Sequence, residues 1–207
     1  MKRVPGDRAE RRPARVKGMR RRASIVSVTV ALCIDRRFDE ITIKDIAAAA
    51  GVSCGTVHNH FAHKHEILGV FSRDIAASLA AAAEADARRG GSVRQDVFAV
   101  WRDLRRFVDD YRGIFGSLLH EWLNPDVARG ARARDDFGLA TLLGCVVERG
   151  RSAGQVDPAI DTAHLGALLA DLMVAAVAHY CRTGDGEAAD FAMAADLALL
   201  WHGVRAP

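Results

Sequence analysis

Four histidines close together in the sequence are the first residues that could do chemistry. His58, His60, His63 and His65 form the pattern H-x-H-x-x-H-x-H, and imidazole nitrogens are common ligands of zinc and copper. A metal site needs ligands that converge on one point. Residues two apart on a helix point away from one another, so the spacing of His58 and His60 disfavours a shared ion, and we predict no metal site.

Cysteine usage and known motifs limit the remaining chemistry. The four cysteines (Cys33, Cys54, Cys145 and Cys181) have no paired spacing, which is typical of a reduced cytosolic protein without a disulfide framework. The sequence contains no P-loop, no G-x-G-x-x-G and no H-E-x-x-H pattern. We therefore expect neither enzyme activity nor a bound cofactor.

The composition and the spacing of apolar residues favour helices throughout. Half of the 207 residues are hydrophobic, only 6% are aromatic and five are prolines, and alanine, leucine and arginine are strong helix formers. Ile25, Val28 and Leu32 recur at three- and four-residue steps, which is one face of a helix over residues 20–37. No segment alternates with the period of a strand. We predict an all-α fold of about nine helices.

Two short helices joined by a glycine turn are predicted between Thr42 and Lys64. Thr42 and Asp45 have the spacing of a capping box at a helix start, and Gly51 can end that helix in a left-handed conformation. Ser53 is a good N-cap for the next helix, which we expect to end near residue 60 or 61. A helix of about nine residues, a tight turn and a second short helix have helix-turn-helix spacing.

This window resembles the tetracycline-repressor (TetR) family of bacterial regulators, and the resemblance extends over about residues 20–71. The matching residues are Phe38, Thr42, Ile46-Ala47, Ala50-Gly51-Val52-Ser53, Gly55-Thr56-Val57, His60-Phe61 and Lys64. The resemblance implies that the helix from Ser53 enters the major groove of double-stranded DNA. The implied DNA-contacting residues are Thr42, Lys44, Ser53, Cys54, Gly55, Thr56, His58, Asn59, His60 and Lys64.

Three positions between Thr42 and Lys64 depart from the usual pattern of the family. Cys54 stands where a basic or polar residue is frequent, His58 where a phosphate-contacting tyrosine is typical, and His63 where a small N-cap is usual. Cys54 has two interpretations, a small side chain that faces the groove or a redox-sensitive thiol at a helix N-terminus. The window has few cations, so we expect the N-terminal arm to supply much of the electrostatic affinity for DNA.

The charge of the chain is concentrated at its N-terminus. Residues 1–22 hold ten lysines and arginines against two acidic residues, which gives +8 and leaves −5 on the rest of a chain of net charge +3. We predict a flexible basic arm over 1–19, a DNA-binding domain over 20–68 and a regulatory and dimerisation domain over 69–207. Three arginines at 20–22 precede an apolar run as in an export signal, but no small-residue cleavage site follows. We therefore expect a cytoplasmic protein.

The second domain is expected to hold a ligand cavity and a dimer interface. A break at residues 88–92 precedes a helix that Ser92 and Gln95 can cap, and further helices are expected at roughly 114–123, 126–152, 160–182 and 186–204. The family resemblance implies a cavity for a small, hydrophobic or aromatic effector, although an aromatic stripe at helical spacing is also typical of a packed core. The candidate lining residues are Trp101, Phe107, Tyr111, Phe115, Trp122, Phe137, Met173 and Tyr180.

The last two helices are apolar nearly all round. A helix at the end of a small protein has difficulty in burying both sides within one chain, so we predict a homodimer through the helices at 160–182 and 186–204, with no membrane contact. One large monomeric core is the alternative. Together with the family resemblance, these features predict a transcriptional regulator, with repression relieved by a small molecule as the expected mode. The sequence names neither the effector nor the operator.

Overall fold

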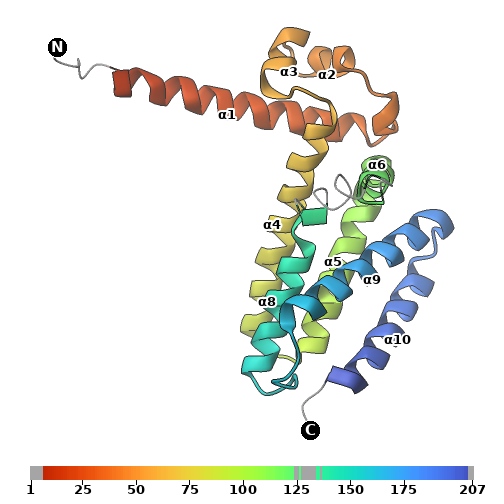
Figure 1. The fold of residues 1–207 in the computed structure, drawn as a ribbon. Helices are drawn as coiled ribbons and strands as arrows, with labels where there is room; N and C mark the ends of the chain where they lie inside the picture. The colour runs from red at the N-terminus through yellow and green to blue at the C-terminus, as the bar shows by residue number, and fades with distance from the viewer. Residues whose placement is uncertain (1–6, 124–125, 127–133, 136, 205–207) are drawn as a thin grey trace.

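The regular secondary structure of the described part of the chain is helical. A computed structural model describes residues 7–123, 126, 134–135 and 137–204 (Figure 1). These residues form nine α-helices and one short 3-10 helix and contain no β-strand, which confirms the predicted all-α class. In chain order the elements are α1 (Asp7–Leu32), η1 (Phe38–Glu40), α2 (Ile43–Ala49), α3 (Cys54–His60), α4 (His65–Arg89), α5 (Val93–Asp110), α6 (Arg112–Trp122), α8 (Leu139–Ser152), α9 (Thr162–Thr183) and α10 (Gly186–Val204).

A small domain of α1, α2 and α3 forms one end of the molecule (Figure 1). Ile46, Val57 and Phe61 are fully buried there, because the apolar positions of each short helix fall on one side. α2 begins with the predicted capping box, in which the Asp45 N–H donates to Thr42 Oγ1 at 3.1 Å and the Thr42 N–H donates to Asp45 Oδ2 at 2.9 Å. The caps were therefore readable from the sequence.

α1 is longer than the sequence analysis predicted. It begins at Asp7 rather than near Arg20, so residues 7–19 of the predicted flexible arm continue the helix, and the helix projects beyond the rest of the small domain (Figure 1). The segment is rich in arginine and alanine, which are good helix formers, and Asp7 lies at the N-terminal end, where the helix dipole favours a negative charge. Pro13 and Gly18 lie within this helix and lower its propensity without ending it.

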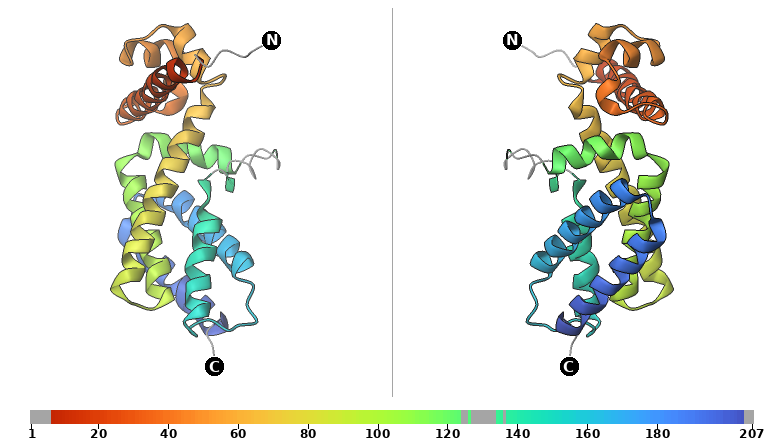
Figure 2. Two further views of the ribbon diagram at one scale, coloured as in Figure 1. Left: turned by 90° about the vertical axis from the view of Figure 1, so that its left-hand side faces the viewer. Right: turned by 90° about the vertical axis from the view of Figure 1, so that its right-hand side faces the viewer.

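The remaining helices form a second, larger domain. α4 leads out of the small domain along the length of this part, and α5 returns beside it after a break at Gly90, whose φ is 75° (Figures 1 and 2). Ser92 and Gln95 form the second predicted capping box at the start of α5. The observed α6, α9 and α10 agree closely with the predicted segments, whereas much of the first half of the segment predicted at 126–152 lies outside the described residues.

α8 and α9 make the closest helix contact of this domain. A Cβ on Gly166 would lie only 2.4 Å from the backbone nitrogen of Gly144 and 2.7 Å from the Ala140 carbonyl oxygen. Small residues at such positions allow two helix backbones to approach each other. Figure 2 shows α9 running obliquely across this side of the domain, with α10 returning beside it.

The two domains touch where the start of α6 meets the end of α1. A Cβ added to Gly113 would lie only 2.0 Å from the Cys33 carbonyl oxygen and 2.9 Å from the Arg36 carbonyl oxygen. Cys33 is buried at this junction, and burial raises the pKa of its thiol to about 11. The junction therefore leaves no room for a side chain at position 113 of α6. It also holds a thiol, that of Cys33, which is protonated at neutral pH.

Candidate nucleic-acid interface

The turn between α2 and α3 has the geometry of a helix-turn-helix. α2 ends at Ala49, and Gly51 follows with φ 63°, a conformation that glycine adopts without steric cost. The Val52 N–H then donates to the Ala47 carbonyl at 3.0 Å. Ser53 begins the next helix as its N-cap. The glycine turn thus sets the two short helices against each other as the sequence predicted.

α3 has a buried face and an exposed face. Val57 is buried against the small domain, and this anchors the helix. Thr56 and His60 are half-buried at its edges. The predicted DNA-contacting residues that are exposed on or beside the helix are Ser53, Cys54, Gly55, His58 and Asn59. Short polar side chains on one exposed face suit contacts to base edges and phosphates in a major groove.

The Ser53 hydroxyl is held by the helix that it begins. Its Oγ accepts from the Thr56 N–H at 3.1 Å and lies 3.0 Å from Thr56 Oγ1. Residues 51–55 also fit the pattern G-x-S-x-G of a nucleophilic serine, a match that the sequence analysis overlooked. That pattern requires a strand-to-helix turn, whereas Ser53 follows a helix. The geometry is that of an N-cap.

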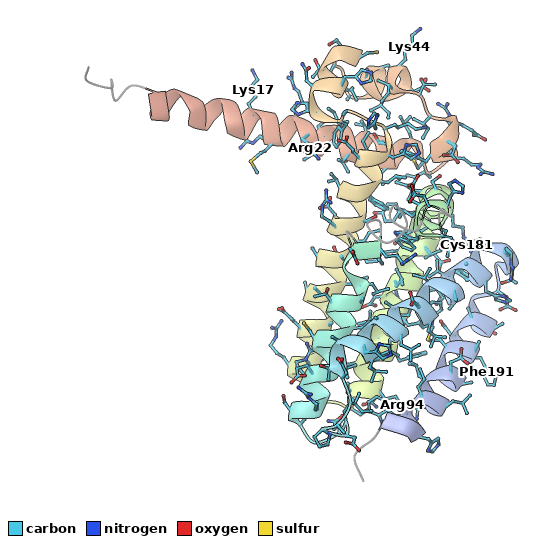
Figure 3. The ribbon with its side chains drawn as sticks, viewed as in Figure 1. Lys17, Arg22, Lys44, Arg94, Cys181 and Phe191 are labelled. Carbon is cyan, nitrogen blue, oxygen red and sulfur yellow. The ribbon has the colours of Figure 1, made fainter. Side chains whose placement is uncertain are left out.

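Cationic side chains flank the exposed face of α3. Lys44 is exposed on α2 and Lys17 on α1, and Figure 3 shows both on the side of the small domain that faces away from α4 to α10. Thr42 is exposed, but its hydroxyl donates to Asp45 at 2.8 Å. Hydrogen bonds from Thr42, above all from its backbone N–H, lower the pKa of Asp45, which also pairs with Arg36 at 3.4 Å.

Lys64 makes structural contacts in addition to its predicted role. Its ammonium donates to the carbonyl oxygens of Phe38 at 2.8 Å, Ile41 at 2.9 Å and Asp39 at 3.3 Å. It also lies 4.5 Å from the centre of the Phe38 ring. A lysine has three N–H donors, and all three are used here. These hydrogen bonds join the start of α4 to the loop before α2, and the DNA contact of Lys64 stays a prediction.

Arg22 is a residue that the sequence analysis missed. Its Nη1 donates to the His60 carbonyl at 2.6 Å, and its guanidinium lies 4.3 Å from the centre of the Phe61 ring. A cation is favourable at the C-terminal end of a helix, so Arg22 fixes the end of α3 from α1. Ten basic residues crowd the first 22 positions, and no local signal distinguishes this one from the others.

The histidines do not gather around one point. His65 lies 3.6 Å from Glu121 and meets the Phe38 ring edge-on at 5.9 Å. His58 and His63 are exposed. Within the described part of the chain, no three histidine, cysteine, aspartate or glutamate side chains lie close enough to hold a metal ion.

The eight predicted ligand residues fall into separate groups in the larger domain. Trp122 packs edge-on against Phe115 at 6.4 Å and lies 4.7 Å from Phe137 between ring centres. Phe107 stacks on Tyr111 at 6.4 Å, and both line a hollow of about 460 Å³ between α1, α4 and α5. Met173 of α9, another of the predicted ligand residues, is fully buried and belongs to neither of these two groups.

Two more of the predicted ligand residues belong to a polar network. Asp190 of α10 accepts from the Trp101 indole N–H at 2.9 Å and from Arg105 Nε at 2.9 Å. Arg105 Nη1 also donates to Asp109 at 2.9 Å, and Tyr180 of α9 donates its hydroxyl to the same carboxylate. These bonds tie α5 to α9 and α10, so Trp101 and Tyr180 have structural partners that the sequence did not reveal.

α9 and α10 expose large apolar side chains. Leu168 on α9 is 46% exposed, and Phe191 and Leu199 on α10 are 79% and 74% exposed. By length and composition α9 alone among the described helices could cross a membrane, and 44% of its most apolar window is buried within the protein. Large apolar side chains exposed on two helices are candidates for an interaction site.

These features define a class of protein. A small three-helix unit whose last helix, α3, is exposed after a glycine turn has the architecture of a helix-turn-helix DNA-binding domain. The larger helical domain follows directly through α4. Residues 25–70 match the sequence profile of the family described as bacterial regulatory proteins, tetR family. Residues 25–70 therefore carry the N-terminal domain of the TetR family of transcriptional regulators.

Solved structures share the fold over most of the chain. FadR of Thermus thermophilus, a TetR family repressor in complex with lauroyl-CoA, has a TM-score of 0.76 at 24% identity and covers 86% of this chain and 92% of its own. RolR in complex with resorcinol has a TM-score of 0.70 at 19% identity, covering 91% and 89%. FadR of Bacillus subtilis with stearoyl-CoA has a TM-score of 0.68 at 14% identity, covering 86% and 96%. No curated protein sequence matches the chain significantly.

Proposed function

We propose that the chain is a cytoplasmic homodimeric repressor that binds a pseudo-palindromic operator and is released by a small molecule. The observation that supports DNA binding most strongly is the exposed face of α3, held by Val57 on one side and by Arg22 at its end. The proposed contacts come from Thr42, Lys44, Ser53, Cys54, Gly55, Thr56, His58, Asn59 and His60. In a dimer, two such helices enter successive major grooves about 34–36 Å apart.

The dimer is proposed to form through α9 and α10. Their exposed apolar side chains, Leu168, Phe191 and Leu199, would be covered by the same helices of a second copy, and a two-fold interface uses the same patch on both subunits. Phe191→Glu should shift the protein to monomer in analytical ultracentrifugation. Leu123→Glu changes another exposed apolar residue outside these helices and is the matched control. A monomeric wild-type protein would overturn this part.

The effector is proposed to be an apolar or aromatic molecule. Its support is the aromatic content of the larger domain, including the group of Trp122, Phe115 and Phe137, and the lauroyl-CoA, stearoyl-CoA and resorcinol bound by proteins of the same fold. Binding would displace α4, which leads directly to the small domain. A ligand must prefer the non-binding state by about 1–3 kcal/mol to give a typical allosteric effect.

A gel-shift titration tests the proposal directly. Purified protein is expected to bind one duplex from the DNA that flanks its own gene in preference to a scrambled duplex of equal length. Lys44→Gln should weaken binding to all duplexes, because a phosphate contact carries no sequence information. Arg88→Gln makes the same charge change on an exposed residue at the far end of α4 and should leave binding unaltered. The absence of any sequence preference would overturn the function.

The role of the basic N-terminal segment has its own readout. If residues 1–19 neutralise phosphates, their deletion should reduce the slope of log affinity against log salt concentration. An unchanged slope would assign DNA affinity to the α2 and α3 region alone.

A further inference from the structure

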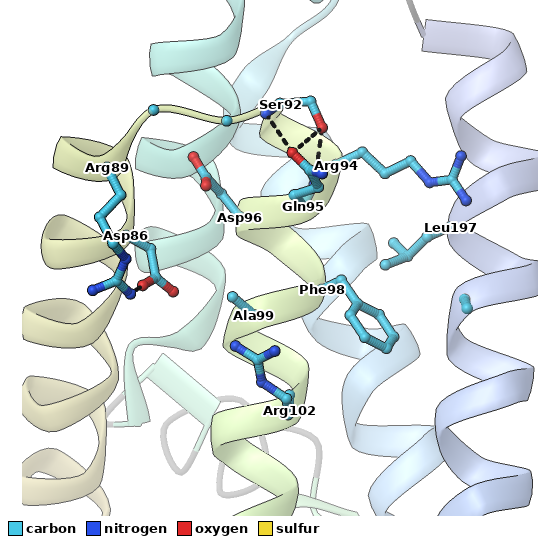
Figure 4. A pocket seen from close by; sticks show the side chains of 13 residues that line it. Asp86, Arg89, Ser92, Arg94, Gln95, Asp96, Phe98, Ala99, Arg102 and Leu197 are labelled. Carbon is cyan, nitrogen blue, oxygen red and sulfur yellow. Dashed lines mark hydrogen bonds and ion pairs between the residues drawn. The ribbon is translucent and has the colours of Figure 1, made fainter.

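A second hollow lies at the end of the larger domain that is remote from α3. It has a volume of about 670 Å³ and lies between the last turn of α4, the first turns of α5 and the side of α10 (Figure 4). Cavities that bind small molecules commonly have volumes of about 300–1,000 Å³. α4 separates the hollow from the helix-turn-helix by 25 residues of helix, or about 37 Å at 1.5 Å per residue.

Three residues of α5 form one stripe along this hollow. Arg94, Phe98 and Arg102 are spaced four residues apart, so they lie one above another on the same helix face. Figure 4 shows Arg94 and Phe98 directed toward α10, where Leu197 faces them, whereas Arg102, further along α5, turns its guanidinium toward α4; both arginines line the hollow. Phe98 is half-buried and packs against the core. The stripe thus places an anchored ring between two arginine positions of α5, one directed toward α10 and the other toward α4.

The two arginines of the stripe have no side-chain partners among the residues that the structure describes. Neither Arg94 nor Arg102 forms an ion pair or a side-chain hydrogen bond with the described residues. Two other arginines nearby are paired: Arg106 of α5 with Asp103 at 3.1 Å, and Arg89 of α4 with Asp86. Free guanidinium groups beside a hollow are the groups that bind phosphate or carboxylate with two parallel hydrogen bonds.

The remaining groups in the hollow refine the expected ligand. Asp86 is already neutralised by Arg89, and Figure 4 places Asp96 on the α4 side of α5, away from Arg94. The N-terminal end of the 18-residue α5 also lies here, and its dipole favours an anion. The side toward α10 therefore combines positive charge with an apolar wall of Phe98 and Leu197.

We propose that this hollow binds an adenine nucleotide, with its phosphates on Arg94 and Arg102 and its base against Phe98. A flat base can stack on a phenylalanine ring, and the Cα atoms of the two arginines are about 12 Å apart by helical rise, which suits an extended polyanion. The two possible sources are a free nucleotide and the nucleotide part of coenzyme A, since both carry adenosine and phosphates. Operator DNA is disfavoured, because the site is a hollow at the opposite end of the molecule.

Isothermal titration calorimetry of the full chain tests the site. The probes are ATP, adenosine 3′,5′-bisphosphate and coenzyme A, with adenosine and inorganic pyrophosphate as the two halves of the ligand. We expect ATP or adenosine 3′,5′-bisphosphate to bind more tightly than either half. Preference for ATP indicates a free nucleotide, and preference for the bisphosphate and coenzyme A indicates the coenzyme.

Variants connect the binding to the stripe. Arg94→Gln/Arg102→Gln should weaken nucleotide binding by at least about tenfold, because each lost hydrogen bond to a charged group costs roughly that factor. Arg88→Gln/Arg106→Gln makes the same charge change at exposed positions that do not line the hollow and should keep wild-type affinity. Phe98→Leu retains an apolar side chain and should reduce binding of ATP but not of pyrophosphate.

Several outcomes would overturn the site. One is that none of the three probes gives a heat of binding. Another is that the two double variants lose equal nucleotide affinity. A third is that Arg94→Gln/Arg102→Gln, and not its control, weakens operator binding, which would make the stripe a DNA contact. Operator binding by the wild-type protein is measured separately, so failure of the nucleotide site is distinguishable from failure of the proposed regulatory function.

Discussion

Replacing Gly113 with alanine should force apart the two domains at their point of contact. The new Cβ would stand 2.0 Å from the Cys33 carbonyl oxygen and 2.9 Å from that of Arg36. Ordinary contacts begin near 3.4 Å, so backbone must move by more than an ångström. Overpacking of this kind typically costs about 1–3 kcal/mol. The preference of a helix for alanine over glycine offsets less than about 1 kcal/mol of this.

Gly116 provides a matched control on the same helix. It lies three residues further along α6, and a Cβ there would meet nothing within 4 Å. Gly116→Ala should therefore stabilise the protein by about 0.5–1 kcal/mol through helix propensity alone. The two variants carry the same chemical change, so the difference in their unfolding free energies isolates the clash with the end of α1.

Urea unfolding followed by circular dichroism measures that difference, and a gel shift measures its consequence for DNA binding. We expect Gly113→Ala to unfold at lower urea than the wild type, with weaker operator binding as the small domain is displaced. If Gly113→Ala proves as stable as Gly116→Ala and binds the operator equally well, the close approach of α6 to the end of α1 is wrong.

Three further predictions test single residues. Lys64→Met should destabilise the protein by about 1–3 kcal/mol, since carbonyls lose their donors; unchanged thermal unfolding would contradict the three hydrogen bonds. Arg149 has Nε and Nη2 buried without hydrogen-bond partners among the described residues, so Arg149→Met should raise the unfolding temperature, and a lowered unfolding temperature would contradict this reasoning. Backbone N–H groups of His164 and Ala163 lower the pKa of Asp161. Its charge therefore stabilises the fold above the unfolded-state pKa, and this contribution is lost as the pH falls through the folded-state pKa. Asp161→Asn should reduce the loss of unfolding free energy at acid pH. An unaltered pH dependence would contradict the proposed contribution of the Asp161 N-cap.

The parts of the fold that follow from local chemistry were readable from the sequence. The capping boxes at Thr42 and Ser92 and the left-handed Gly51 depend on residues within three or four positions, so their spacing alone predicts them. The start of α1 was placed wrongly, because Pro13 and Gly18 lower helix propensity without preventing a helix in a segment otherwise rich in helix formers.

The candidate sites were less predictable wherever tertiary contacts decide them. Lys64 bonds to carbonyls more than twenty residues away and Arg22 to one 38 residues away, and neither contact leaves a periodic signal in the sequence. The sequence analysis gave Trp101 and Tyr180 as candidate lining residues of a ligand cavity. It could not distinguish a cavity lining from the polar network with Asp190 and Asp109 that they join.

The contacts of Lys64 bear on how a signal would reach the DNA. The ammonium fastens the beginning of α4 to the chain before α2, while Arg22 fastens the end of α3 to α1. With both ends secured, the small domain resists internal bending. A shift of α4 would turn it as one rigid piece and alter the spacing between the two recognition helices of a dimer, leaving each of them folded and ready to rebind.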